Sequence, residues 1–247
     1  MQIPANFIKH LIEIVIKDIN TNQRVICLGQ NILNWHPNEV ATTFKELGVS
    51  INNEAFEQFR TQSTYQMRDL FELINVCDFN QYDSHLANGA DVALDFNSKL
   101  DLSKIKKADY VFEFSFIEHL FDIKSAFFNM VNITNIGGIV HHLSPLNSYN
   151  HGFYNLSLNA FFDFYSINGF SEMSAYILRT AENRLKEPLV EITHIDYFAE
   201  PFSLPIEALS SQHNQFFIGF IGKKHMEVDE LKVPSQSVYS AIKMVNQ

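Results

Sequence analysis

Hydrophobic positions along this chain follow two different spacings. Some segments repeat an apolar residue about every 3.6 positions, which is typical of amphipathic helices, and others are short apolar runs typical of buried strands. The helical spacing covers residues 6–19, 38–47, 53–73, 117–134 and 158–168. The strand-like runs cover residues 24–28, 71–78, 90–97, 108–115, 137–145, 174–179 and 215–224. Strands alternating with helices predict β-α-β units and an α/β fold, with a mostly parallel, doubly wound sheet covered on both faces.

The same alternation indicates a single domain over residues 1–224. Residues 182–212 contain three prolines and interrupt the pattern, so we expect a long excursion between the last strands there. Residues 225–247 are predicted to form a peripheral tail.

Composition and charge narrow the classes of protein that fit this chain. Hydrophobic residues make up 46% of its 247 residues, which excludes a disordered chain. The formal net charge of −10, without a dense Lys/Arg run, disfavours a nucleic-acid ligand. Cys27 and Cys77 lie in apolar runs and are predicted to be reduced core residues. With no signal-peptide pattern and no apolar run near the ~20 residues that span a bilayer, we expect a soluble, cytoplasmic protein.

Acidic residues follow several of the predicted strands. Asp78, Asp95 and Glu118 each come after an apolar run, as does Gly29. Doubly wound sheets bind ligands at the carboxyl ends of their strands, so we expect these four residues at one edge of the sheet. A carboxylate after the second strand can accept hydrogen bonds from the ribose hydroxyls of a nucleoside. The alternative is that these acids cap the following helices, but their joint occurrence in chain order favours a ligand site.

Three short motifs occur in a characteristic order. Glu118-His119 follows a predicted strand, Gly137-Gly138 opens the next one, and an H-G-F-Y segment at residues 151–154 comes behind it. This order resembles the class I S-adenosylmethionine-dependent methyltransferases, in particular those acting on small molecules. The resemblance covers residues 22–175 and 215–224. It implies a Rossmann-like, seven-stranded, mostly parallel sheet with an antiparallel C-terminal strand, and S-adenosylmethionine as the cofactor.

The resemblance also implies roles for individual residues. Gly29 lies where the backbone turns under the methionine part of the cofactor. The Gln30 amide, in place of a second glycine, can donate to the methionine carboxylate and accept from its ammonium group. The remaining implied cofactor contacts are Asp78 at the ribose, Asp95 and Phe96 at the adenine, and Phe114 and Ser115 beside the sulfonium.

The separation of Gly29 from Asp78 is longer than is usual in such proteins. We interpret residues 38–73 as a helical insertion over the cofactor cleft that could act as a lid. Residues 182–212 are placed near the substrate side.

Histidines and tyrosines of the second half are the candidate catalytic and substrate-binding residues. His151 is the candidate base or substrate-orienting residue, with Tyr154 beside it. An alternative for His151 is a loop histidine that fixes the turn before Gly152. His119, His142 and Tyr149 are expected on the substrate side, although His119 could instead orient its loop.

A metal site is an alternative role for Glu118, His141 and His151. The chain has no H-x-x-x-H or C-x-x-C spacing to support it, so no metal is predicted. His141 and His142 are adjacent in a strand and must point to opposite faces of the sheet.

The leading hypothesis is a methyltransferase acting on an oxygen or nitrogen of a small polar metabolite, such as a sugar- or phosphate-bearing precursor. Because Gln30 and Asn31 stand where glycines are usual, a non-catalytic protein that keeps the fold without cofactor use is the alternative. A nicotinamide-dependent oxidoreductase is disfavoured, since the turn at Gly29 lacks the further glycines that bring the backbone close to a pyrophosphate.

Overall fold

The computed structural model describes residues 2–86, 89–148, 151–180, 191–195 and 215–237. The predictions for Tyr149, for most of the excursion at residues 182–212 and for the last ten residues of the tail fall outside this part of the chain. None of the described helices is long and apolar enough to cross a membrane.

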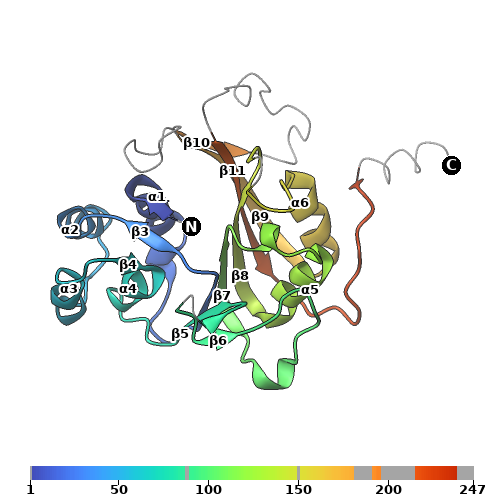
Figure 1. Ribbon diagram of the computed structural model, residues 1–247, viewed down its shortest axis with the longest axis horizontal. Helices are drawn as coiled ribbons and strands as arrows, with labels where there is room; N and C mark the ends of the chain where they lie inside the picture. The colour runs from blue at the N-terminus through green and yellow to red at the C-terminus, as the bar shows by residue number, and fades with distance from the viewer. Residues whose placement is uncertain (1, 87–88, 149–150, 181–190, 196–214, 238–247) are drawn as a thin grey trace.

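Eight strands of the described chain form the main sheet (Figure 1). From one edge to the other they are β10 (Glu191–Ile195), β9 (Phe170–Thr180), β11 (Gln215–Lys224), β8 (Thr134–Pro145), β7 (Ala108–Phe114), β2 (Val25–Leu28), β5 (Phe79–Asp83) and β6 (Val92–Ala93). The pairs from β8 to β6 are parallel, whereas β11 is antiparallel to both β8 and β9, and β10 is antiparallel to β9. The predicted doubly wound, mostly parallel sheet with an antiparallel C-terminal strand is confirmed, and β10 adds an edge strand to the seven expected.

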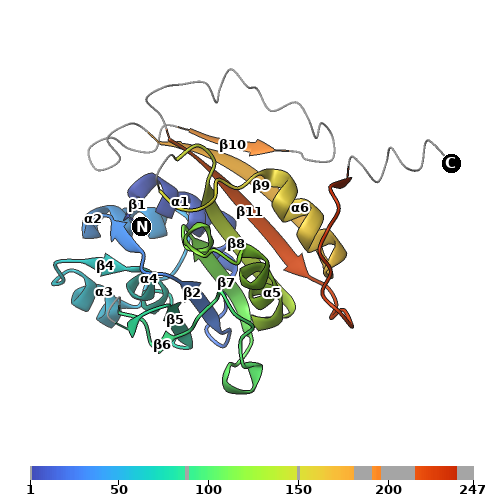
Figure 2. The same ribbon diagram turned by 45° about the vertical axis from the view of Figure 1, so that its right-hand side comes forward.

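Helices cover both faces of this sheet, as the alternation of strands and helices along the chain predicts. Figure 2 shows α1 (Ala5–Ile14) and α4 (Met67–Glu72) on one side, and α5 (Ile123–Ile133) and α6 (Leu158–Ile167) on the other. Side chains of β2 divide between the two cores: Val25 and Cys27 pack with α1 and α4, and Ile26 and Leu28 pack with α5 and α6. Successive side chains of a strand point to opposite faces, so a fully apolar strand serves two cores.

A second, three-stranded sheet lies beside the first core. It consists of β1 (Gln2–Pro4), β3 (Ile32–Asn34) and β4 (Tyr65–Gln66), with α2 (Pro37–Glu46) and α3 (Asn53–Phe59) next to it. Phe44, Phe59 and Phe71 of the predicted insertion belong to the same core cluster as the main-sheet residue Phe112. The insertion therefore extends the core on one face of the sheet, and its role as a lid stays a prediction.

The apolar run at residues 71–78 is not the strand that we predicted. Its first residues end α4, whose start is capped by Gln66 and Asp69, and Asn75 adopts a left-handed conformation with φ of 62° after the helix. The strand β5 begins only at Phe79. The helix predicted over residues 117–134 also divides, into a 3₁₀ turn, η4 (Ile117–His119), and α5, whose N-cap is Asp122. Two further 3₁₀ turns are η1 (Ile16–Asp18) and η3 (Leu102–Lys104).

Candidate functional site

The turn after β2 requires its glycine. Gly29 has φ of +74°, and its N–H donates to the carbonyl of Tyr82 on β5 at 2.8 Å. A Cβ atom on Gly29 would lie 3.2 Å from Cδ2 of Phe116. The left-handed backbone strains any other residue at this position, and a Cβ there would press against the Phe116 ring, so both features favour glycine.

The structure contradicts the predicted position of Asp78. This residue precedes β5, and its carboxylate pairs with Arg24 at 2.8 Å where β2 begins. Asp78 therefore lies at the amino ends of the strands, opposite Gly29. The acid at the carboxyl end of β5 is Asp83, which is 6% exposed and follows Tyr82, the register partner of Leu28. Asp83 was missed because the strand begins eight residues later and ends five residues later than predicted.

Two polar side chains follow Gly29 in the same turn. The Gln30 amide nitrogen lies 3.9 Å from the place that a Cβ of Gly89 would occupy, so its side chain points to the loop after β5. Asn31 is 1% exposed, and its Nδ2 donates to the Leu28 carbonyl at 3.4 Å. Its Oδ1 is buried with no hydrogen-bond partner among the described residues. A buried, unpaired acceptor is uncommon, so Asn31 is a site candidate that the sequence reasoning did not select.

The predicted adenine residues take different positions. Asp95 is exposed, and its carboxylate accepts a hydrogen bond from the Asn97 N–H at 3.0 Å. Phe96 is fully buried and packs edge-to-face on Phe116, with ring centroids 5.6 Å apart. The Phe96 ring is therefore enclosed by the core, although Phe116 connects it to the turn at Gly29.

The turn after β7 separates the two residues predicted beside the sulfonium. Phe114 is 1% exposed and packs against Phe7 in the core. Ser115 has φ of +58°, which is rare outside glycine, and its N–H donates to the Leu143 carbonyl at 2.8 Å. The partly exposed Ser115 therefore lies at the strand end, whereas the structure places Phe114 in the interior.

Glu113 holds this turn from within the protein. Its Oε1 accepts the backbone N–H groups of Phe116 at 2.7 Å and Ile117 at 3.2 Å. Its Oε2 lies 2.8 Å from His142 Nδ1, and His142 Nε2 lies 2.6 Å from the Tyr165 hydroxyl. Because a carboxylate only accepts, Nδ1 carries a proton that it donates to Glu113.

His141 and His142 point to opposite faces, as predicted. His142 is fully buried with both ring nitrogens bonded, so the structure places it in the core and not on the substrate side. His141 is also buried, and its Nε2 lies 2.8 Å from the Tyr176 hydroxyl. Burial lowers the pKa of His141 well below its ordinary value and raises that of Tyr165 well above, with the Glu113 charge as a second cause at Tyr165.

Glu118, His119 and His151 meet at the carboxyl end of β7, and we call them the Glu–His cluster. Oε1 of Glu118 lies 3.3 Å from His151 Nε2 and 3.9 Å from His119 Nε2, and the two imidazole centroids are 4.9 Å apart. Ser115 Oγ donates to Glu118 Oε1 and lies 3.0 Å from His151 Nε2. Glu118 is fully buried, and the two histidines are partly exposed.

The H-G-F-Y segment forms one wall of the Glu–His cluster. A Cβ on Gly152 would lie 2.7 Å from the Glu118 carbonyl oxygen, so only glycine allows this approach. Phe153 N–H donates to the same carbonyl at 2.7 Å. The Tyr154 hydroxyl donates to the Phe121 carbonyl at 2.8 Å, which anchors the segment to the loop after η4. Tyr154 therefore fastens the His151 loop, and a direct role in catalysis stays a prediction.

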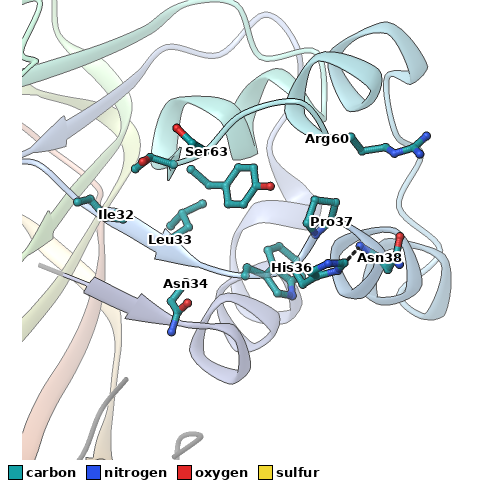
Figure 3. Close-up of a pocket in the computed structure, with 11 residues that line it drawn as sticks. Ile32, Leu33, Asn34, His36, Pro37, Asn38, Arg60 and Ser63 are labelled. Atoms are coloured by element: carbon teal, nitrogen blue, oxygen red, sulfur yellow. Dashed lines mark hydrogen bonds between the residues drawn. The ribbon is translucent and has the colours of Figure 1, made fainter. Parts of the chain in front are cut away.

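A cavity of about 670 Å³ lies away from this cluster, in the small N-terminal layer (Figure 3). β3, β4 and the start of α2 line it, with Trp35, Arg60 and Tyr65 among the side chains. The Arg60 guanidinium is paired with Glu57 at 2.9 Å. None of the predicted site residues lines this cavity.

Comparison with known proteins finds no matching family model and no matching curated relative. Among solved structures, a methyltransferase from Thermotoga maritima described as a possible histamine N-methyltransferase matches at 10% identity and a TM-score of 0.43, over 89% of this chain and 91% of its own. A putative methyltransferase from Haloferax volcanii, in complex with the activator Trm112, matches at 12% identity and 0.42, over 86% and 87%. A putative methyltransferase from Bacillus halodurans matches at 9% and 0.40, over 84% and 94%.

All three are described as methyltransferases, the class to which the sequence resemblance pointed. At these identities and TM-scores the matches assign no activity to this chain. The strand order of its own sheet defines the fold of this chain.

Proposed function

We propose that this protein is an S-adenosylmethionine-dependent methyltransferase that acts on an oxygen or nitrogen of a small polar metabolite. The supporting observation is that Gly29 follows β2, Asp83 ends β5, and Glu118 and His119 follow β7, where they meet His151 from the loop after β8. These three strands are neighbours, and the chain order reverses at β2. A crevice at such a reversal is where doubly wound sheets bind their ligands.

Residues of this edge fit the parts of the cofactor. Asp83 replaces Asp78 as the carboxylate for the ribose hydroxyls, because it follows the second strand of the parallel set. The orphaned Oδ1 of Asn31 is an acceptor suited to the methionine ammonium group. When bound, S-adenosylmethionine supplies an electrophilic methyl group on a positively charged sulfur.

The chain's own contribution is to position the acceptor and receive its proton. His151 Nε2 lies within hydrogen-bond distance of Ser115 Oγ and faces a partly open region, so it could accept a proton from a hydroxyl or amine. The net charge of −10 disfavours nucleic acid as the acceptor and supports a small polar molecule. Holding donor and acceptor in line supplies most of the rate enhancement in such a displacement.

One feature favours the non-catalytic alternative. The Phe116 ring lies against Gly29, and Phe96 packs on it from the core, so the chain's own side chains occupy part of the space beside the glycine turn. A protein that keeps this packing in solution would carry the fold without binding the cofactor.

Calorimetry with S-adenosylhomocysteine separates the two functions. We expect one site per chain, and we expect Asp83→Asn to weaken binding about 10-fold or more, since a hydrogen bond to a charged group contributes about 1.5–3 kcal/mol. Asp78→Asn is the matched control, because Asp78 lies at the other end of the strands and should leave the affinity unchanged.

No binding at millimolar ligand would overturn the proposal and support the non-catalytic alternative. Equal effects of Asp78→Asn and Asp83→Asn would contradict the assignment of the ribose site. Methyl transfer from labelled S-adenosylmethionine to fractionated small metabolites then tests the acceptor class, and label recovered only in nucleic acid or protein would exclude a small-molecule acceptor.

A further inference from the structure

We propose that the Glu–His cluster is a binding site for a divalent transition-metal cation. Glu118, His119 and His151 each offer one ligand atom, and these atoms all lie within 4.8 Å of one another. Ligands about 2.1 Å from a shared ion lie about 3.0–3.4 Å apart in octahedral or tetrahedral geometry. The distances of 3.3 Å and 3.9 Å from Glu118 Oε1 to the two histidines are close to that range, and all three ligand atoms lie within 4.8 Å, so binding one ion requires the side chains to rotate toward it.

The state of Glu118 points independently to a cation. Its side chain is fully buried, and Oε2 has no hydrogen-bond partner among the described residues. The ion-pair partners that the described structure provides for it are His119 and His151, with no lysine or arginine. Burying a carboxylate without a compensating charge costs several kcal/mol. A bound cation would offset that cost and give the second oxygen a partner.

The surrounding backbone holds the two arms of the cluster together. The first arm is η4, which places Glu118 and His119, and the second is the loop that carries His151. Gly152 lets this loop approach to a distance that a Cβ would not allow, and Phe153 N–H bonds to the Glu118 carbonyl. Backbone contacts therefore hold ligands that are 32 residues apart in the sequence within reach of one ion, which is the preorganisation that a metal site needs.

The donor set indicates which cations fit. Two imidazoles and one carboxylate suit Mn²⁺, Fe²⁺, Co²⁺ and Zn²⁺ better than Ca²⁺ or Mg²⁺, which prefer oxygen ligands. The side chains of His119 and His151 are 46% and 33% exposed, so the open side of the cluster faces solvent. Three protein ligands leave coordination positions there for water or for an oxygen of another molecule.

A serine hydrolase arrangement does not explain the same residues. In such a triad the acid bonds to the imidazole nitrogen that faces away from the serine. Here Ser115 Oγ and Glu118 Oε1 both contact Nε2 of His151. Convergence of several donors on one point is the pattern of a ligand set and not of a proton relay.

A consequence for methyl transfer rests on the proposed function. The ion held by Glu118, His119 and His151 would lower the pKa of an acceptor hydroxyl at one of its open positions, so that this hydroxyl would lose its proton to solvent more readily. The oxygen lone pair then forms the bond to the methyl carbon while the carbon–sulfur bond breaks, and the sulfur keeps that electron pair. In this arrangement His151 is a metal ligand and does not act as the base.

Metal titration of the full chain tests the site. After treatment with a chelator, calorimetry with Mn²⁺ and Zn²⁺ and the electron paramagnetic resonance of Mn²⁺ should show one bound ion per chain. Glu118→Gln, His119→Ala and His151→Ala should each weaken binding about 10-fold or more. His119 is the most exposed of the three ligands, so its alanine variant tests the site with little risk to folding, and unfolding followed by Trp35 fluorescence verifies each variant.

His225→Ala is the matched control. His225, just after β11, and Glu172 of β9 form an exposed pair 3.0 Å apart, which represents ordinary surface affinity for metals. Loss of binding in the cluster variants with retention in His225→Ala supports the site. Failure to bind one ion, equal binding in the His119→Ala protein, or loss in the control overturns it. Titration of the same samples with S-adenosylhomocysteine in chelator separates failure of the metal site from failure of the proposed function.

Discussion

Glu113 is expected to be the polar residue on which the turn after β7 depends most. Replacing it with leucine keeps a similar volume and removes every acceptor. Three close donors then lose their partner: the N–H groups of Phe116 and Ile117, at 2.7 and 3.2 Å, and His142 Nδ1, at 2.8 Å. The Ser144 hydroxyl, at 3.4 Å, makes a longer fourth contact to Glu113. Glu113 itself is fully buried, so water does not replace it without opening the core.

The magnitude follows from these three contacts. A buried donor left without a partner costs about 1–3 kcal/mol, so the three together cost about 3–9 kcal/mol before relaxation. Burial of the leucine side chain stabilises the folded state by about 1.5–3 kcal/mol and offsets part of this cost. We expect Glu113→Leu to lower the free energy of unfolding by about 1.5–6 kcal/mol, a large part of the 5–15 kcal/mol typical of a domain. Glu113→Gln keeps one oxygen for the backbone donors and should lose about 1–3 kcal/mol.

Urea unfolding measures both variants. The chain has a single tryptophan, Trp35, which is buried in the core on the α1 side, so its fluorescence reports on that core, and the far-ultraviolet circular dichroism reports on the secondary structure of the whole chain. Coincident transitions allow the free energies to be compared. A Glu113→Leu protein within about 1 kcal/mol of the parent would refute the reasoning, because it would mean that the three donors find other partners.

Further outcomes follow from single residues. A Cβ on Gly219 would lie 1.9 Å from Cζ of Tyr176, so Gly219→Ala should destabilise the protein by about 3 kcal/mol or more, and an unchanged urea midpoint would contradict this packing. Burial lowers the pKa of His10 from 6.5 to about 4. Between pH 6.5 and pH 4 the unfolded chain therefore binds a proton at His10 that the folded chain does not bind. The stabilisation from neutral His10 is complete above pH 6.5, and as the pH falls toward 4 the free energy of unfolding decreases by at most about 1.4 kcal/mol per pH unit. His10→Phe should lose that part of the pH dependence, and identical pH profiles of the two proteins would exclude it. Burial raises the pKa of Cys27 to about 12, whereas Cys77 is exposed, so a thiol reagent at pH 8 should modify one cysteine in the folded protein and two after denaturation. Modification of both in the folded state would show that Cys27 is accessible.

The local pattern determined most of the architecture. The continuous apolar run of β2 predicts a strand buried on both faces, and the structure divides its side chains between the two cores. The side chains of the adjacent residues His141 and His142 likewise had to point to opposite faces of the sheet, because the side-chain period of a strand is two. Gly29 was identified correctly as a turn, since only a residue without Cβ accepts a φ of +74° easily.

Tertiary contacts decided which acidic residue lies at the carboxyl end of the second parallel strand. The apolar residues before Asp78 fit both the end of a helix and a strand, since short apolar runs do not distinguish the two by periodicity. Leu70 and Phe71 pack into the core of the main sheet as part of α4, which moves the strand to β5 and leaves Asp83 at its carboxyl end. The helix cap at Gln66 and Asp69 was the local signal for this outcome.

The sequence by itself determined most of the elements and the faces they bury, because apolar spacing and glycine conformations are local properties of the chain. Only the tertiary structure decided that His151 lies against Glu118 and that His142 is enclosed with Glu113 and Tyr165. Such pairings depend on strand order, on register and on the close approach that Gly152 permits. These long-range contacts leave no periodic trace in the sequence.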